Sequence, residues 1–232
     1  MTRIPCYPKG KRCDQSYLRR GEPTPACCMS HLQNLATTVL PPLDEHEVPY
    51  WLDYGSLLGA VREGGIIRHD SDIDIGVRFS HLPELRKAMK DVERAGLHFR
   101  ELNPKEYLRV QMSRRNTLHI CIFVWYSPDE YWSRFKRRRK RAGGQIEPGM
   151  LGRIRYMRPD ETHGKGKDFP EAWITARQRI KFEGIEAWTP VEAEAMLAHR
   201  YGDTWRTPVK HHARQQPQRK EARLGAVQLR GA

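Results

Sequence analysis

The chain has 232 residues and carries 41 Lys and Arg against 28 Asp and Glu, a formal net charge of +13. Its length is enough to bury a sizeable core and predicts one globular domain. It contains neither the run of about 20 apolar residues that a membrane-spanning helix needs nor an apolar segment behind a basic N-terminus, which marks a signal peptide. We therefore expect a cytoplasmic protein without a transmembrane segment.

Hydrophobic periodicity predicts alternating helices and strands. In chain order these are a helix over residues 28–39, a strand over 50–53, a helix over 56–63, a strand over 70–77, a helix over 81–95, strands over 97–102, 107–112 and 118–126, a short strand over 154–157, and a helix over 191–199. Pro41-Pro42 should end the first helix. The strand over 118–126 is almost continuously apolar, so we expect it in the centre of a sheet.

Three aspartates alternate along the second predicted strand. Asp70, Asp72 and Asp74 are spaced two apart, so an extended backbone would place all three on one face. Neighbouring carboxylates repel one another unless a cation lies among them, and clustered oxygen ligands suit Mg²⁺ or Mn²⁺. A solvated acidic edge is the simpler alternative, but the spacing favours a metal site.

A glycine–serine turn precedes the aspartates. A helix beginning near Ser56 would direct its free N–H groups at an anion, and Gly55 would allow that anion to approach the backbone. Arg62 is placed to contact a second phosphate oxygen. Gly-Ser alone is more often a simple helix cap, but together with the aspartates it predicts a site for phosphate and metal. For Asp53, orienting this turn and simply capping it stay equally open.

These two stretches resemble the LicD family of the nucleotidyltransferase-fold superfamily, which includes bacterial phosphocholine transferases, fukutin and fukutin-related protein. The matching residues are Leu52-Asp-x-Gly-Ser-Leu-Leu-Gly-x-x-Arg62 and Ile67-x-x-Asp-x-Asp-Ile-Asp-Ile-Gly76. The resemblance implies an α/β (α+β) fold, with a mixed sheet flanked by helices and a divalent ion on Asp72 and Asp74. It also implies transfer of a phosphorylated alcohol, such as phosphocholine or an alditol phosphate, from a CDP-linked donor to a glycan hydroxyl.

One position departs from the superfamily pattern. Its enzymes usually carry a third carboxylate on a strand beside the Asp-x-Asp pair, and here Cys121 takes that place. A thiol is a poor ligand for Mg²⁺. Three explanations remain open: Asp70 supplies the carboxylate, His119 or Asp129 acts as the base, or the enzyme is weakened. For His119, a packed strand histidine is the simpler alternative.

Four of the five cysteines lie near the start of the chain: Cys6, Cys13, Cys27 and Cys28. In a cytoplasmic protein, clustered thiols bind metal more often than they form disulfides. Four thiolates suit tetrahedral Zn²⁺. The spacing is unusual for a zinc finger, but it resembles the zinc loop of fukutin-related protein. We therefore expect a structural zinc ion, with free or disulfide-paired cysteines as the alternative.

Composition and resemblance together divide the chain into three parts. We expect a zinc-binding loop over residues 1–30 and the catalytic domain over 31–205. Residues 206–232 hold seven Lys or Arg and one Glu with few large apolar side chains, so a disordered basic tail is expected. A second basic run, residues 134–141, carries seven charges in eight positions, and a solvated surface and a polyanion contact stay equally open.

Two other functions remain as alternatives. The same pair of aspartates would serve a nucleotidyltransferase that uses a nucleoside triphosphate. A non-catalytic zinc protein that binds nucleic acid would explain the high positive charge, although acidic side chains repel phosphates unless a metal intervenes. The sequence predicts neither the transferred alcohol nor the oligomeric state.

Overall fold

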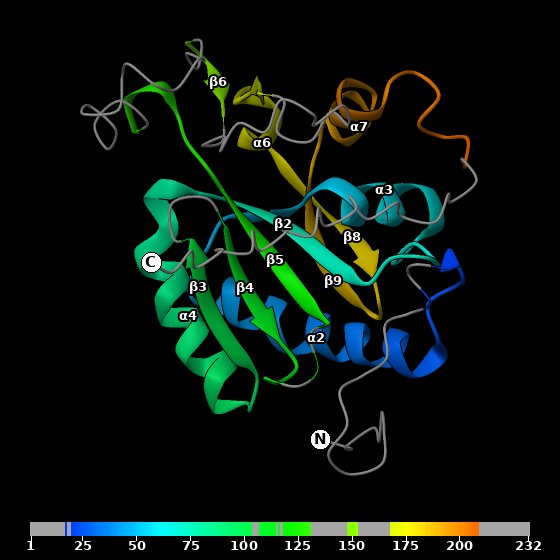
Figure 1. Ribbon diagram of the computed structural model, residues 1–232. Helices are drawn as coiled ribbons and strands as arrows, with labels where there is room; N and C mark the ends of the chain where they lie inside the picture. The colour runs from blue at the N-terminus through cyan, green and yellow to red at the C-terminus, as the bar shows by residue number, and fades with distance from the viewer. Residues whose placement is uncertain are drawn as a thin grey trace, which may run out of the picture.

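The computed structural model describes residues 17, 20–103, 107–114, 116, 118–130, 148–152 and 168–208. A mixed five-stranded sheet lies at the centre of this described part (Figure 1). In spatial order its strands are β1 (Tyr50–Leu52), β2 (Asp72–Arg78), β5 (His119–Trp125), β4 (Tyr107–Gln111) and β3 (His98–Asn103). Strands β2 and β5 are parallel, and the other neighbours are antiparallel. The predicted mixed sheet, with the apolar strand β5 at its centre, is confirmed.

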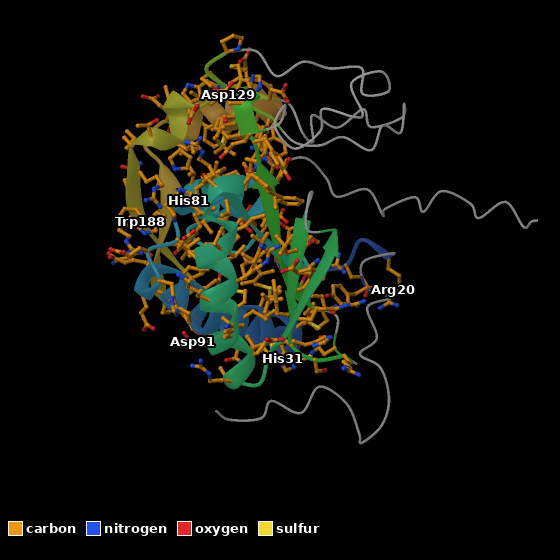
Figure 2. The ribbon with its side chains drawn as sticks, turned by 90° about the vertical axis from the view of Figure 1, so that its left-hand side faces the viewer. Arg20, His31, His81, Asp91, Asp129 and Trp188 are labelled. Atoms are coloured by element: carbon orange, nitrogen blue, oxygen red, sulfur yellow. The ribbon has the colours of Figure 1, made fainter. Side chains whose placement is uncertain are left out.

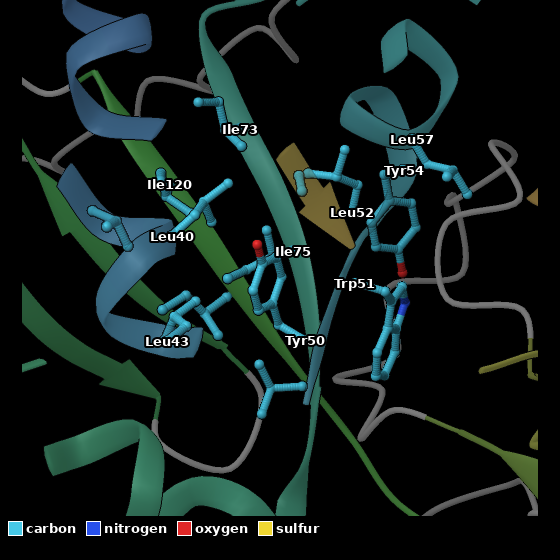
Figure 3. Close-up of a cluster of buried hydrophobic side chains, with 14 of the residues drawn as sticks. Leu40, Leu43, Tyr50, Trp51, Leu52, Tyr54, Leu57, Ile73, Ile75 and Ile120 are labelled. Atoms are coloured by element: carbon cyan, nitrogen blue, oxygen red, sulfur yellow. The ribbon is translucent and has the colours of Figure 1, made fainter. Parts of the chain in front are cut away.

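Helices cover both faces of this sheet. On one face, α2 (Ala26–Glu45) packs on β2, β5 and β4, and α4 (Leu82–Arg94) packs on α2 and β3. On the other face, α3 (Tyr54–Glu63) contacts β2 and α7 (Ala193–Tyr201). Figure 3 shows this division: Leu40 and Leu43 of α2 lie on the side of Ile75 and Ile120, whereas Leu57 of α3 lies on the opposite side of β2.

The register of β2 determines which residues face which layer. Ile73, Ile75 and Val77 are fully buried on the face of the sheet that α2 covers. Asp72 and Asp74 alternate with them and therefore lie on the opposite face, toward α3. The sheet thus separates an apolar core from a layer that contains polar side chains.

The first helix continues through Pro41-Pro42, so the prediction that these prolines end it is wrong. Each proline removes one backbone hydrogen bond from the helix. Leu40 and Leu43 are 1% and 0% exposed, and burying each leucine contributes about 1.5–3 kcal/mol. Their packing against the sheet offsets the cost of the prolines.

A β-hairpin near the end of the described chain is absent from the sequence-based prediction. It comprises β8 (Arg177–Phe182) and β9 (Ile185–Pro190), joined by Glu183 and Gly184 with φ of 52° and 84°. Positive φ at both central residues is typical of a type I′ turn. The indole Nε1 of Trp188 donates to Asp44 Oδ1 at 2.8 Å, which anchors the hairpin to the end of α2.

The remaining elements are short: η1 (Phe79–His81), β6 (Met150–Leu151), β7 (Phe169–Pro170) and α6 (Ala172–Thr175). The predicted strand over 154–157, the basic run over 134–141 and the tail beyond residue 208 lie outside the described residues. Across the described part of the chain, no helix has the length and apolar character needed to cross a membrane.

Close packing of Trp51 on Gly76 yields a stability prediction. A Cβ atom added to Gly76 would lie 2.3 Å from Cε2 of the Trp51 ring. We expect Gly76→Ala to lower the free energy of unfolding by about 1–3 kcal/mol, measured by urea denaturation, because the buried ring has no room to move. Trp51→Phe removes the nearest ring atoms, so Gly76→Ala should cost less in that background. An equal cost in both backgrounds would contradict this packing.

Candidate functional site

The pairing of β2 with β5 brings together the residues at the beginning of both strands. Asp72 lies beside His119, and Asp74 lies beside Cys121. Because paired residues of neighbouring strands face the same side, all four side chains share the face that is covered by α3. Cys121, expected beside the Asp-x-Asp pair, is indeed next to Asp74.

Asp70 also lies near Gly55 and Asp74, but it belongs to a loop and not to the strand in which it was predicted. Strand β2 begins at Asp72, so the prediction that Asp70 belongs to it is wrong. A Cβ atom added to Gly55 would nevertheless lie 2.8 Å from Asp70 Oδ2 and 4.0 Å from Asp74 Oδ2. The absence of a side chain on Gly55 therefore leaves a space that is bordered by an oxygen of each of these two carboxylates.

The segment before α2 holds the Asp70 loop. The hydroxyl of Thr24 donates to the Asp70 carbonyl at 2.6 Å, and the Thr24 amide donates to the Arg68 carbonyl at 2.8 Å. Asp70 is thus placed by tertiary contacts from an earlier segment of the chain, whereas the strand register places Asp72 and Asp74.

The glycine–serine turn is tied to Asp74 by two backbone contacts. Ser56 Oγ accepts a hydrogen bond from the Asp74 amide at 2.8 Å, and the Asp53 amide donates to the Asp74 carbonyl at 2.9 Å. Ser56 is only 4% exposed. Its observed contact therefore positions Asp74, and direct binding of phosphate by Ser56 stays a prediction.

Helix α3 presents its N-terminus to the carboxylates. It begins at Tyr54, two residues earlier than expected. The first four N–H groups of a helix have no acceptor within the helix itself. In α3, the Asp53 N–H donates to the Asp74 carbonyl, and the Tyr54 N–H donates to Asp53 Oδ1 at 3.0 Å. The other two are the amides of Gly55, whose Cβ position lies beside Asp70 Oδ2, and of Ser56, whose hydroxyl bonds the Asp74 amide.

Arg62 lies at the other end of α3. Its guanidinium pairs with Glu63 and its Nη1 donates to the Trp205 carbonyl at 3.4 Å. Six residues of helix separate it from Ser56, a rise of about 9 Å. The structure thus holds Arg62 on neighbours at the C-terminal end of the helix, and its predicted contact with phosphate would need another side-chain conformation.

Asp53 caps α3 and is itself fully buried. Besides the Tyr54 amide, its carboxylate accepts a hydrogen bond from Trp125 Nε1 at 3.0 Å and pairs with Arg200 Nη2 at 2.7 Å. The next residue, Tyr54, has a φ of 42°, which is unfavourable for a residue with a side chain. Asp53 therefore both caps the helix and holds the strained turn in place.

Sequence reasoning did not single out Arg200. Its side chain is 2% exposed, and its guanidinium lies over the rings of Tyr54, Trp125 and Phe169, at 4.1, 5.2 and 5.6 Å from the ring centroids. These contacts link α7 to the turn that carries Gly55. The sequence offered little signal for this role, because Arg200 is far from Asp53 along the chain.

His119 and Cys121 differ in exposure. His119 Nε2 lies 3.7 Å from Asp72 Oδ2, with its side chain 14% exposed. Cys121 is 7% exposed; burial, together with the charges of Asp74 and Asp72, raises the pKa of its thiol to about 12. The protein without metal therefore keeps Cys121 protonated at neutral pH, and the thiol is a weak base.

Asp129, the other residue considered as a base, does not join this cluster. It follows the carboxyl end of β5, whereas His119 begins that strand, and the strand itself spans about 20 Å. Figure 2 shows Asp129 at the upper edge of the molecule.

The two described cysteines of the expected zinc loop occupy the first turn of α2. Cys27 is exposed, whereas Cys28 is 2% exposed and packs in the core. Cys6 and Cys13 lie outside the described residues. The zinc site therefore stays a prediction.

The contribution of the Arg200–Asp53 ion pair to stability can be tested by replacing Arg200. Arg200→Met leaves the Asp53 carboxylate buried without its cation, so we expect the free energy of unfolding in urea to fall by about 3–5 kcal/mol. Adding Asp53→Asn removes the buried charge, and the double variant should regain part of the loss. A single variant as stable as the parent would contradict the role of this pair.

Comparison with known proteins gives consistent matches. Residues 47–146 match the family described as LicD/FKTN/FKRP, nucleotidyltransferase domain. Ribitol 5-phosphate transferase FKRP from Mus musculus is 28% identical over 192 residues, which are 81% of this chain and 34% of that protein, and the Homo sapiens protein gives the same figures. Ribitol-5-phosphate transferase FKTN from Mus musculus is 26% identical over 167 residues, 70% of this chain and 30% of that protein. The chain thus spans about a third of the length of these curated relatives.

A crystal structure of the lincosamide antibiotic adenylyltransferase LnuA, with lincomycin bound, covers 78% of this chain and 89% of that chain. Its TM-score is 0.40 and its sequence identity is 15%, a likeness too weak to support an argument. The matched residues 47–146 include the glycine–serine turn, Asp70, Asp72 and Asp74, and all of β5. Over residues 47–146 the chain is therefore similar to the nucleotidyltransferase domain of the LicD/FKTN/FKRP family.

Proposed function

We propose that the protein is a divalent-metal-dependent phosphotransferase that moves an alditol phosphate from a CDP-linked donor to a glycan hydroxyl. The observation that carries this proposal is that oxygens of Asp70 and Asp74 both border the space left by Gly55 in the first turn of α3. Relatives named as ribitol 5-phosphate transferases favour ribitol phosphate as the transferred group, with phosphocholine as another member of the same substrate class.

The carboxylates fit a hard divalent ion. Asp70, Asp72 and Asp74 supply only oxygen ligands, and the space above Gly55 is bordered by two of them. Mg²⁺ and Mn²⁺ prefer such oxygen sites. When bound, the ion would neutralise negative charge on the transferred phosphate and on the departing CMP.

The protein's own groups would bind and orient the donor. The amides of Gly55 and Ser56 lie at the positive end of α3, where an anionic phosphate is stabilised. The acceptor oxygen forms a bond to the alditol-linked phosphorus while the bond from that phosphorus to CMP breaks. In this proposal His119 takes the hydroxyl proton, and its partly exposed ring, with Nε2 3.7 Å from Asp72 Oδ2, supports that role.

The decisive experiment measures CMP release from CDP-ribitol, CDP-glycerol and CDP-choline with Mg²⁺ and a panel of glycan acceptors. We expect Asp72→Asn and Asp74→Asn to lower the rate at least about 100-fold with the fold unchanged, because charge stabilisation is lost. Asp203→Asn, an exposed aspartate outside the site, is the matched control. Full activity in both site variants would refute the assigned roles, and pyrophosphate release from a nucleoside triphosphate would indicate a nucleotidyltransferase instead.

We also propose that Cys6, Cys13, Cys27 and Cys28 hold a structural zinc ion. The exposed position of Cys27 supports this, because its thiol is accessible to an ion that Cys6 and Cys13 would also bind. Cys27→Ser should lower the zinc content and the melting temperature of the full chain, by about 2–4 °C for each kcal/mol lost. Gln33→Ser, on the exposed face of the same helix, is the control. Unchanged zinc content and melting temperature would argue against a zinc loop.

A further inference from the structure

A second group of potential metal ligands lies beside the oxygen cluster. One ligand atom each from Asp72, His119 and Cys121 lies within 4.8 Å of the other two. The three residues come from two paired strands: Asp72 lies next to His119, and Cys121 follows two residues later on the same face. The regular register of β2 and β5 therefore holds these ligands together.

The spacing of these atoms suits one tetrahedral ion. Bonds of about 2.0–2.3 Å to oxygen, nitrogen and sulfur place ligand atoms about 3.3–3.8 Å apart. Asp72 Oδ2 and His119 Nε2 are 3.7 Å apart. Small side-chain rotations would close the remaining separations, which do not exceed 4.8 Å.

The chemistry of this set differs from that of the three aspartates. It offers one carboxylate oxygen, one imidazole nitrogen and one sulfur, whereas Mg²⁺ selects oxygen ligands. Imidazole and thiolate together favour zinc and cobalt. Cys121 is buried and lies at the inner side of this group of ligands. The Asp72 and His119 side chains are 26% and 14% exposed, so an ion could reach the group from solvent.

We propose that Asp72, His119 and Cys121 bind a borderline-soft divalent ion such as Zn²⁺ or Co²⁺, at a site that shares Asp72 with the oxygen cluster of Asp70, Asp72 and Asp74 and takes its other two ligands from β5. On binding, the Cys121 thiol releases its proton to solvent as its sulfur bonds the ion. Because Asp72 belongs to both ligand sets, this ion would compete with Mg²⁺ for that carboxylate. The binding itself needs neither donor nor acceptor and does not depend on transferase activity.

The test is a titration of the metal-free full chain with Co²⁺, followed by the sulfur-to-cobalt absorption and by the number of ions bound. We expect Cys121→Ser to bind one Co²⁺ fewer than the parent, or to bind that ion more than about 100-fold more weakly, since even outer-shell changes weaken metal sites about 10- to 100-fold. His119→Ala should lose the same ion. His98→Ala, which changes a partly exposed histidine on the edge strand β3, should bind Co²⁺ like the parent.

The N-terminal cysteines require a separate control. Cys27→Ser should keep the absorption that Cys121→Ser loses, and a variant with both changes should lose both contributions. If Cys121→Ser does not fold, as judged by circular dichroism, His119→Ala alone decides the outcome. Equal Co²⁺ stoichiometry and affinity in the parent and in every folded variant of Cys121 or His119 would overturn the proposal. Because CDP donors are absent, this result is independent of the transferase assay.

Discussion

The buried carboxylate of Asp53 is the contact on which the site depends. It binds the first amide of α3, the indole of Trp125 and the guanidinium of Arg200, so it joins the turn to β5 and α7. A buried charge with this many partners has few alternative positions, because each lost contact would leave a polar group unsatisfied. The strained Tyr54 and the open Gly55 are held in place as a consequence.

Three kinds of contact position Asp70, Asp72 and Asp74 beside the turn that carries Gly55. Strand register places Asp72 and Asp74, contacts of Thr24 hold the loop of Asp70, and Ser56 fixes the Asp74 backbone. Three negative charges in a small space are unfavourable without a cation. This geometry is the basis for the proposed binding of a divalent ion and, through it, a phosphate.

The same sheet face carries two kinds of potential metal ligand. Oxygen ligands lie toward Gly55, and the nitrogen and sulfur of His119 and Cys121 lie along β5. Asp72 stands between the two groups. In the proposed second site, Cys121 supplies a soft sulfur ligand where a carboxylate would supply oxygen, so this residue would determine which metal is preferred.

The sequence by itself determined the local features: the alternation of Asp72 and Asp74 with buried isoleucines, the glycine–serine turn and the apolar central strand. Each of these features depends on residues only a few positions apart, so hydrophobic periodicity and the residue types of turns are enough to predict it. Only the tertiary structure decided the course of α2 through Pro41-Pro42, the contact of Asp70 with the Gly55 turn and the pairing of Asp53 with Arg200. These features depend on burial and on contacts between distant segments, whose energies exceed the local preferences that a sequence pattern reveals.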